Sequence, residues 1–153
     1  MRKAIVLFLI LSLLLCACGP AGTPSAGETQ EFTDSTGRTV TLPASITRIA
    51  ISGPLSQIYI LPLAGDLLVG VSTAYAEDAQ RYLPAYIYEK AEIGQLYGGK
   101  GEMDLEALLS AAPDVVIDIG EPKKTTAEDL TALTEQTGIP FIHIDATVAT
   151  APE

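Results

Sequence analysis

The chain of 153 residues has no tryptophan, one histidine, two cysteines and 9 basic residues against 19 acidic ones. The single histidine argues against a bare zinc or manganese site, because such sites need several histidines and carboxylates. The shortage of lysine and arginine makes nucleic acid an unsuitable partner, since no basic patch is available to neutralise phosphates. The sequence also has no phosphate-binding loop, no GxGxxG motif and no nucleophile–base pair. We therefore expect a protein that is not an enzyme and has no cofactor.

Long apolar runs are also scarce, with one exception at the N-terminus. After Arg2 and Lys3, apolar residues run from Ala4 to Cys18 with a single polar interruption. A positive start followed by such a run is typical of a secretory signal peptide. The run covers 15 positions, whereas a membrane-spanning helix needs about 20. The pattern predicts export and makes a transmembrane anchor the weaker interpretation.

Both cysteines lie at the end of this run. A CxC metal or redox pair would need further ligands that the chain lacks, and a disulfide across one residue is strained. The segment Leu15-Cys16-Ala17-Cys18 resembles a bacterial lipobox, although Cys16 stands where that pattern usually has Ala, Ser, Gly or Thr. The resemblance implies that residues 1–17 are a lipoprotein signal peptide and that Cys18 receives the lipid. Diacylglycerol, with any later N-acylation, would then hold the protein at the outer face of the cytoplasmic membrane, on the cell surface or in the periplasm.

Residues 18–30 are predicted to be a flexible tether, because residues 19–27 contain only Gly, Pro, Ala, Thr and Ser. The folded part is expected to span residues 31–153 as one domain, long enough to bury a core. Without residues 1–17 the chain carries 7 basic and 19 acidic residues, a formal charge of −12. Such an acidic surface favours solubility and can help the protein meet a basic partner.

Alternating strand and helix patterns follow a hairpin predicted over Phe32–Leu42. The predicted strands are Arg48–Ile51, Leu67–Val71, Ala91–Gly94, Asp114–Ile119 and Pro140–Asp145. The predicted helices are Leu55–Ala64, bent or ending early at Pro62; Asp78–Tyr88, despite Pro84; a helix capped by Asp104 that runs to Ala111; and a helix from a capping box at Thr126 and Asp129 to Thr137, closed by Gly138. Fully apolar strands with crossover helices predict a three-layer α/β/α, Rossmann-like lobe with a mostly parallel sheet.

Five segments occur in a characteristic order: DSTGRTVTLP (34–43), RIAI (48–51), LAGDLLVGVS (63–72), MDLEALLSAAPDVVID (103–118) and LTEQTGIPFIHID (133–145). Together with the lipobox they resemble the substrate-binding lipoproteins of ABC importers for ferric siderophores, haem and cobalamin. Those proteins have two α/β lobes with the ligand held between them. The chain resembles the N-terminal lobe only, and we expect it to be a fragment. A lone lobe supplies half of a ligand site.

The resemblance implies a membrane-anchored solute-binding component that captures an iron chelate, haem or a corrinoid and delivers it to a permease driven by a separate ATPase. Ligand contacts are expected on the loops that follow the strands, at Pro54, Ser56, Gln57, Tyr75, Tyr97, Glu121 and Lys123. Tyrosine offers a flat face and a phenol for hydrogen bonding or ferric ligation, although each tyrosine is equally well explained by partial burial. Glu106 matches the family position that pairs with permease arginines; otherwise it complements a helix dipole.

Two other functions are open at this point. A single-lobe lipoprotein could serve as a sensor or as an adaptor that binds another protein. An anchored hydrolase could use an aspartate and His143, which requires an exposed His143 beside a carboxylate. For His143 itself we expect a satisfied core or edge histidine of the last strand.

Overall fold

The computed structural model describes residues 27–97 and 102–147. Cys16, Cys18, the predicted signal peptide and most of the predicted tether lie outside the described residues. Within the described ranges, no helix combines the length and the apolar character that crossing a bilayer requires.

An antiparallel hairpin opens the fold, as predicted. Strands β1 (Thr29–Thr33) and β2 (Thr39–Pro43) pair from Thr29 opposite Pro43 to Thr33 opposite Thr39. The hairpin begins two residues before position 31, so the end of the predicted tether belongs to β1. Alternate residues of β2 are buried, which anchors the hairpin to the core.

Three parallel strands form the central sheet in the order β3 (Ile49–Ile51), β4 (Val115–Gly120) and β5 (Phe141–Asp145). In the register, Ile51 lies opposite Ile117, and Ile117 lies opposite Ile142. The three strands are apolar on both faces, as expected for a parallel sheet that helices cover on both sides.

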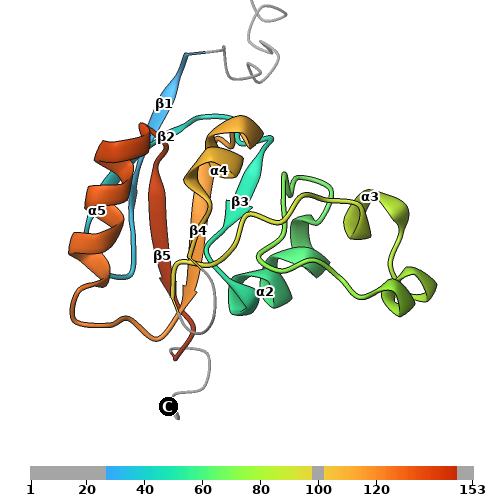
Figure 1. Ribbon diagram of the computed structural model, residues 1–153. Coiled ribbons are helices and arrows are strands. Elements are labelled where there is room, and N and C mark those ends of the chain that lie inside the picture. The colour runs from blue at the N-terminus through green and yellow to red at the C-terminus, as the bar shows by residue number, and fades with distance from the viewer. Residues whose placement is uncertain (1–26, 98–101, 148–153) are drawn as a thin grey trace, which may run out of the picture.

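Each face of the sheet packs against its own cluster of apolar side chains. Helix α2 (Pro54–Ala64) and strand β2 cover one face, where Ile60 and Val40 join Ile51 and Ile117. Helices α4 (Leu105–Ala111) and α5 (Thr126–Thr137) cover the other face through Leu108 and Leu130. Figure 1 shows this arrangement, with the sheet between α5 and α2. The predicted three-layer lobe is therefore confirmed.

The predicted ends of α4 and α5 are confirmed, but the capping box is wrong. Asp104 caps α4 by accepting the Ala107 N–H at 2.9 Å, and Gly138 ends α5 with φ 71°. At the start of α5, Thr125 is the N-cap and makes no side-chain cap bond. The Thr126 hydroxyl accepts the Lys123 N–H at 2.8 Å, so it serves the preceding loop.

Two predicted strands are reduced to isolated bridges. Segment 67–71 joins β3 through one parallel bridge, Ile49 to Leu68. Segment 91–94 in turn joins segment 67–71 through another parallel bridge, Val71 to Glu92. Because β3 has only three residues, it offers little ladder to a further strand. The predicted helix Asp78–Tyr88 is likewise split into a 3-10 turn, η1 (Glu77–Arg81), and a single turn of α-helix, α3 (Ala85–Tyr88). Pro84 is the N-cap of α3, because proline has no N–H to continue the preceding turn.

The outer edge of β5 is bonded by the hairpin turn and by α5. Asp34 accepts the His143 N–H at 3.2 Å, and Ser35 bonds the His143 carbonyl at 3.0 Å and the Asp145 N–H at 3.0 Å. The Phe141 carbonyl accepts a bond from Arg38 at 2.8 Å, and the Phe141 N–H bonds Thr134 of α5 at 3.2 Å. The DSTGR segment therefore closes the sheet at this edge.

Candidate functional site

The two neighbours of β3 in the sheet lie on opposite sides of it. Segment 67–71, which follows β3 and α2, lies on one side of β3, and β4 pairs on the other side. In open α/β sheets such a reversal leaves a crevice outside the carboxyl ends of the strands, and ligands bind there. The loops after β3 and β4 meet at this point.

A pocket of about 180 Å³ occupies the crevice. Its walls come from the loop and first turn of α2, from the end of β4 and the loop after it, and from the segment that contains Tyr97. The lining residues are Ser52, Gly53, Pro54, Leu55, Ser56, Tyr97, Asp118, Ile119, Gly120, Glu121 and Lys123. Five of the seven predicted ligand-binding residues line it: Pro54, Ser56, Tyr97, Glu121 and Lys123.

Tyr97 and Lys123 form one wall of the pocket. The Lys123 Nζ lies 4.0 Å from the centroid of the Tyr97 ring, a cation–π contact. The Tyr97 hydroxyl donates a hydrogen bond to Asp129 Oδ2 at 2.9 Å. Burial and this bond to the Asp129 carboxylate raise the pKa of Tyr97 to about 12. The Tyr97 hydroxyl is thus bonded to α5, and the wall offers the pocket a ring and an ammonium group.

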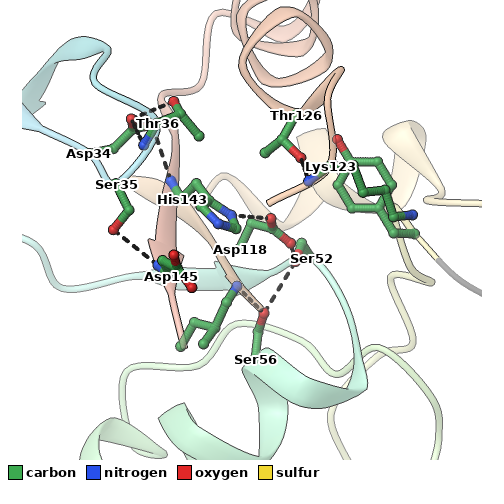
Figure 2. A network of polar contacts seen from close by, with 12 residues as sticks. Asp34, Ser35, Thr36, Ser52, Ser56, Asp118, Lys123, Thr126, His143 and Asp145 are labelled. Atoms are coloured by element: carbon green, nitrogen blue, oxygen red, sulfur yellow. Dashed lines mark hydrogen bonds and ion pairs between the residues drawn. The ribbon is translucent and has the colours of Figure 1, made fainter. Parts of the chain in front are cut away.

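A row of buried polar side chains lies beneath the pocket, as Figure 2 shows. Its members are Ser52, Ser56, Asp118 and His143. Asp118 lies between two partners: one carboxylate oxygen accepts the Ser52 hydroxyl, and the other lies 2.7 Å from His143 Nδ1. The Ser52 hydroxyl lies 3.2 Å from that of Ser56, which in turn accepts the Ile119 N–H at 2.9 Å. The row thus links β5, β4, β3 and α2. Of the row, Ser52, Ser56 and Asp118 line the pocket, and His143 does not.

His143 is buried, as expected for a histidine of the last strand, with 1% of its surface exposed. That burial removes the hydrolase alternative, which required an exposed histidine. The order of the row also differs from that of a nucleophile–histidine pair, because Asp118 lies between the Ser52 hydroxyl and the imidazole. His143 Nε2 is buried without a hydrogen-bond partner among the described residues, a feature that costs about 1–3 kcal/mol.

Gln57 and Tyr75, also predicted as ligand contacts, lie outside the pocket lining and bond each other. Gln57 Nε2 donates to the Tyr75 hydroxyl at 2.7 Å, and Gln57 Oε1 accepts the Ser72 N–H at 2.8 Å and the Ser72 hydroxyl at 3.0 Å. These bonds join α2 to the loop after segment 67–71. Ser56 is likewise committed to the fold, since it is 1% exposed and its hydroxyl is bonded.

Glu106 is the second residue of α4 and is exposed. No hydrogen bond or ion pair with another described residue involves its carboxylate, so it is available to a partner. Glu121 is also exposed, at the rim of the pocket. Within the two described ranges, no group of three or more His, Cys, Asp or Glu side chains has an arrangement that could hold a metal ion.

The row of Ser52, Asp118 and His143 was not predicted from the sequence. Its members lie at matching positions on three strands: Ser52 and Asp118 directly follow the paired residues Ile51 and Ile117, and Asp118 pairs with His143. The available signal was one polar residue at the carboxyl end of each apolar run. That signal becomes a row only when the register is known.

Neither a protein-family model nor a curated protein matches the sequence. Among solved structures, the chain is similar to an ABC transporter solute-binding protein from Sulfurospirillum deleyianum, with 26% identity and a TM-score of 0.64. The described lobe has the fold of ABC transporter solute-binding proteins. The alignment covers 78% of this chain and 38% of that protein. The resemblance to solute-binding proteins of ABC importers noted from the sequence is thus confirmed for the fold of a single lobe.

Two further structures share the fold. The molybdate periplasmic binding protein MolA of Haemophilus influenzae is 23% identical with a TM-score of 0.55, and the match covers 76% of this chain and 34% of MolA. A periplasmic solute-binding protein from Veillonella parvula is 22% identical with a TM-score of 0.53, and the match covers 77% of this chain and 36% of that protein. The chain therefore spans little more than a third of the length of the proteins that it matches.

Proposed function

We propose that the chain is the solute-binding component of an ABC importer, and that the pocket between β3 and β4 is its half of the ligand site. The observation that carries the proposal is the position of this pocket, at the reversal point of a fold shared with solute-binding proteins. An opening of about 180 Å³ is small against the roughly 300–1,000 Å³ of typical ligand sites, in keeping with one wall of a larger site.

The ligand that we propose is an iron chelate, haem or a corrinoid. The lining supports a large ligand with mixed chemistry: Pro54, Leu55 and Ile119 are apolar, and Leu55 is 44% exposed at the rim. Lys123 supplies a cation for an anionic group of the ligand. Because the Tyr97 hydroxyl is bonded to Asp129, its ring face is what we propose contacts the chelate.

Titration of the full-length gene product with haemin, a ferric hydroxamate, a ferric catecholate, cyanocobalamin and molybdate tests this proposal. Titration calorimetry measures the heat of binding, a readout that does not depend on which aromatic residues the rest of the gene product carries. We expect one of the first four probes to bind saturably. A Lys123→Met variant should weaken that binding, whereas Lys124→Met should not, because Lys124 does not line the pocket. Saturable binding of molybdate alone, or of no probe, would overturn the proposed ligand class.

Delivery to the permease is the second part of the proposal, and Glu106 is its proposed contact. A carboxylate in the first turn of an exposed helix can form bidentate pairs with arginine. Glu106→Gln should lower the stimulation of the importer's ATPase without changing ligand affinity. Glu128, exposed in the first turn of α5, provides the matched control, and its change to glutamine should have no effect. Equal effects of the two variants would argue against a specific docking role.

Lipid attachment at Cys18 is the third part of the proposal. It rests on the lipobox resemblance, and its test is independent of ligand binding. Cys18→Ala should leave the protein unprocessed or release it from the membrane fraction, whereas Cys16→Ala should be processed normally. Unchanged membrane association and mobility of the Cys18→Ala protein would contradict the anchor.

A further inference from the structure

The polar row beneath the pocket is unusual for the place it occupies. Ser52, Asp118 and His143 are 2%, 7% and 1% exposed, in a sheet whose other buried positions are apolar. Buried polar groups of this kind can often be replaced by apolar ones of similar volume without loss of stability. Folding alone therefore gives no reason for the row. Departures from the apolar pattern of a core are expected where a functional site is supported.

The row connects segments that make up the pocket floor. Ser52 follows β3 and begins the loop to α2, and Asp118 and Ile119 lie at the end of β4. Through the hydroxyls of Ser52 and Ser56, Asp118 is linked to the N-terminal turn of α2 and to the Ile119 N–H. The position of the Asp118 carboxylate thus helps to set the distance between the two walls.

His143 contacts the Asp118 carboxylate on the side away from the pocket. Its ring lies behind Asp118, away from the pocket lining, and its backbone is held by the hairpin turn through Asp34 and Ser35. We assign Nδ1 as the donor in this contact, because a carboxylate oxygen is an acceptor and the other oxygen of Asp118 already accepts the Ser52 hydroxyl. His143 is therefore a donor fixed to the sheet edge, and it directs one oxygen of Asp118 while Ser52 bonds the other.

We propose that His143 is a positioning residue of the ligand pocket, acting through Asp118 on the loop after β3 and on the end of β4. The proposal rests on the proposed function, because it assigns His143 a role in that same ligand site. It extends the site to a residue that touches neither the pocket nor the ligand. Loss of one hydrogen bond to a charged group corresponds to about tenfold or more in an equilibrium constant.

The test compares two substitutions in the full-length protein. His143→Asn keeps an N–H donor close to the position of Nδ1, whereas His143→Leu keeps the volume and removes the donor. We expect the leucine variant to lose about tenfold in affinity, the equivalent of one hydrogen bond to a charged group, for whichever probe of the panel the natural protein binds best. The asparagine variant should restore most of that loss. Thr134→Val is the matched control, because it removes a bond to β5 at Phe141 without involving the row.

A second measurement is independent of the ligand. In NMR spectra of the protein without ligand, His143→Leu should shift the amide signals of Leu55 and Ile119, and His143→Asn should shift them less. The imidazole of the natural protein should show a protonated Nδ1. If no probe binds, the proposed function fails, and these amide shifts still decide whether His143 positions the floor. If the leucine variant does not fold, Asp118→Leu supplies the comparison, because it removes the acceptor of both the Ser52 and the His143 contacts.

Unmoved amide signals in a folded leucine variant would overturn the proposal. So would shifted signals with unchanged affinity, because the row would then have a structural role only. An equal loss of affinity in Thr134→Val would also overturn it, since the effect would follow from general weakening of β5.

Discussion

The central sheet has a closed edge at β5 and an irregular edge beyond β3. At β5, five backbone groups are bonded by the hairpin turn and α5. Beyond β3, segments 67–71 and 91–94 add only isolated bridges, although Val71 and Ile93 are completely buried. Apolar burial is thus equally good at both edges, and the difference lies in side chains that bond the backbone. Closing an edge requires polar residues at defined positions, which the DSTGR segment supplies.

The largest effect on this comparison is expected from Asp34→Ala. Asp34 is 4% exposed and bonds Thr36, Arg38 and the His143 N–H. Its loss leaves the partly exposed Arg38 guanidinium without its ion-pair partner, and we expect a cost of about 2–3 kcal/mol, below the roughly 3–5 kcal/mol of a fully buried pair. Urea unfolding measures the change. The control is Glu31→Ala in β1, which removes an exposed carboxylate bonded to Thr41 and should cost less than about 0.5 kcal/mol. Similar losses of unfolding free energy in both variants would contradict a special contribution of the β5 edge.

Glycines at the two edges should respond differently to substitution. A Cβ at Gly70 would lie 2.3 Å from Ile93 Cδ1, whereas one at Gly37, in the hairpin turn, would meet nothing within 4 Å. Gly70→Ala should therefore cost about 1–3 kcal/mol through overpacking. Gly37 has φ 83°, so Gly37→Ala should cost about 1–2 kcal/mol through backbone strain.

Asparagine separates the two causes, because it tolerates positive φ but is larger than alanine. Gly37→Asn should recover part of the alanine loss, and Gly70→Asn should be worse than Gly70→Ala. The midpoints of thermal unfolding provide the measurement. If alanine and asparagine rank in the same order at both positions, one cause, either space or backbone conformation, limits substitution at both edges.

Acid should weaken the closed edge. Burial raises the pKa of Asp34, but hydrogen bonds from Thr36, Arg38 and the His143 N–H outweigh it and hold that pKa below the ordinary value. Stability from a lowered pKa is present above the unfolded value of about 3.9 and is lost as pH falls through the folded value. Urea midpoints should thus fall below about pH 4, and less steeply in Asp34→Asn.

Asp114, which bonds Thr47 and Arg48 at the start of β3, serves as the reference for the acid effect. Burial raises its pKa, and bonds from Thr47 and Arg48 lower it further than burial raises it. Asp114→Asn should reduce the acid slope as well, but without changing protection of the β5 amides. An unchanged slope in Asp34→Asn would mean that other carboxylates account for the acid sensitivity.

Hydrogen exchange should reveal the smallest difference between the edges. The amides of Val71 and Ile93 are bonded to Ala91 and Val71 at 2.9 and 2.8 Å, but they belong to bridges and not to a ladder. Local opening of such segments needs less free energy than opening of core strands. Their amides should exchange faster than those of Val116 and His143. Equal protection would show that the irregular edge opens only with the whole lobe.

Much of this fold could be predicted from local sequence signals. The apolar run at 115–119, the cap at Asp104 and the glycine at 138 each act through neighbouring residues, and the structure agrees with all three. The strands predicted at 67–71 and 91–94 failed because pairing depends on the length of the neighbouring strand. The site divides in the same way: loop residues such as Lys123 follow from topology, whereas the partners of His143 follow from register alone.

Unpaired edge strands are where sheet proteins join copy to copy, and long flat edges are a known source of aggregation. The bonded groups along β5 leave no free row of donors and acceptors on which a second molecule could lay a strand. A second molecule therefore finds no strand ladder to extend along this edge. Beyond β3, segments 67–71 and 91–94 add only isolated bridges, so among the described residues that edge has no long strand that could serve as a template.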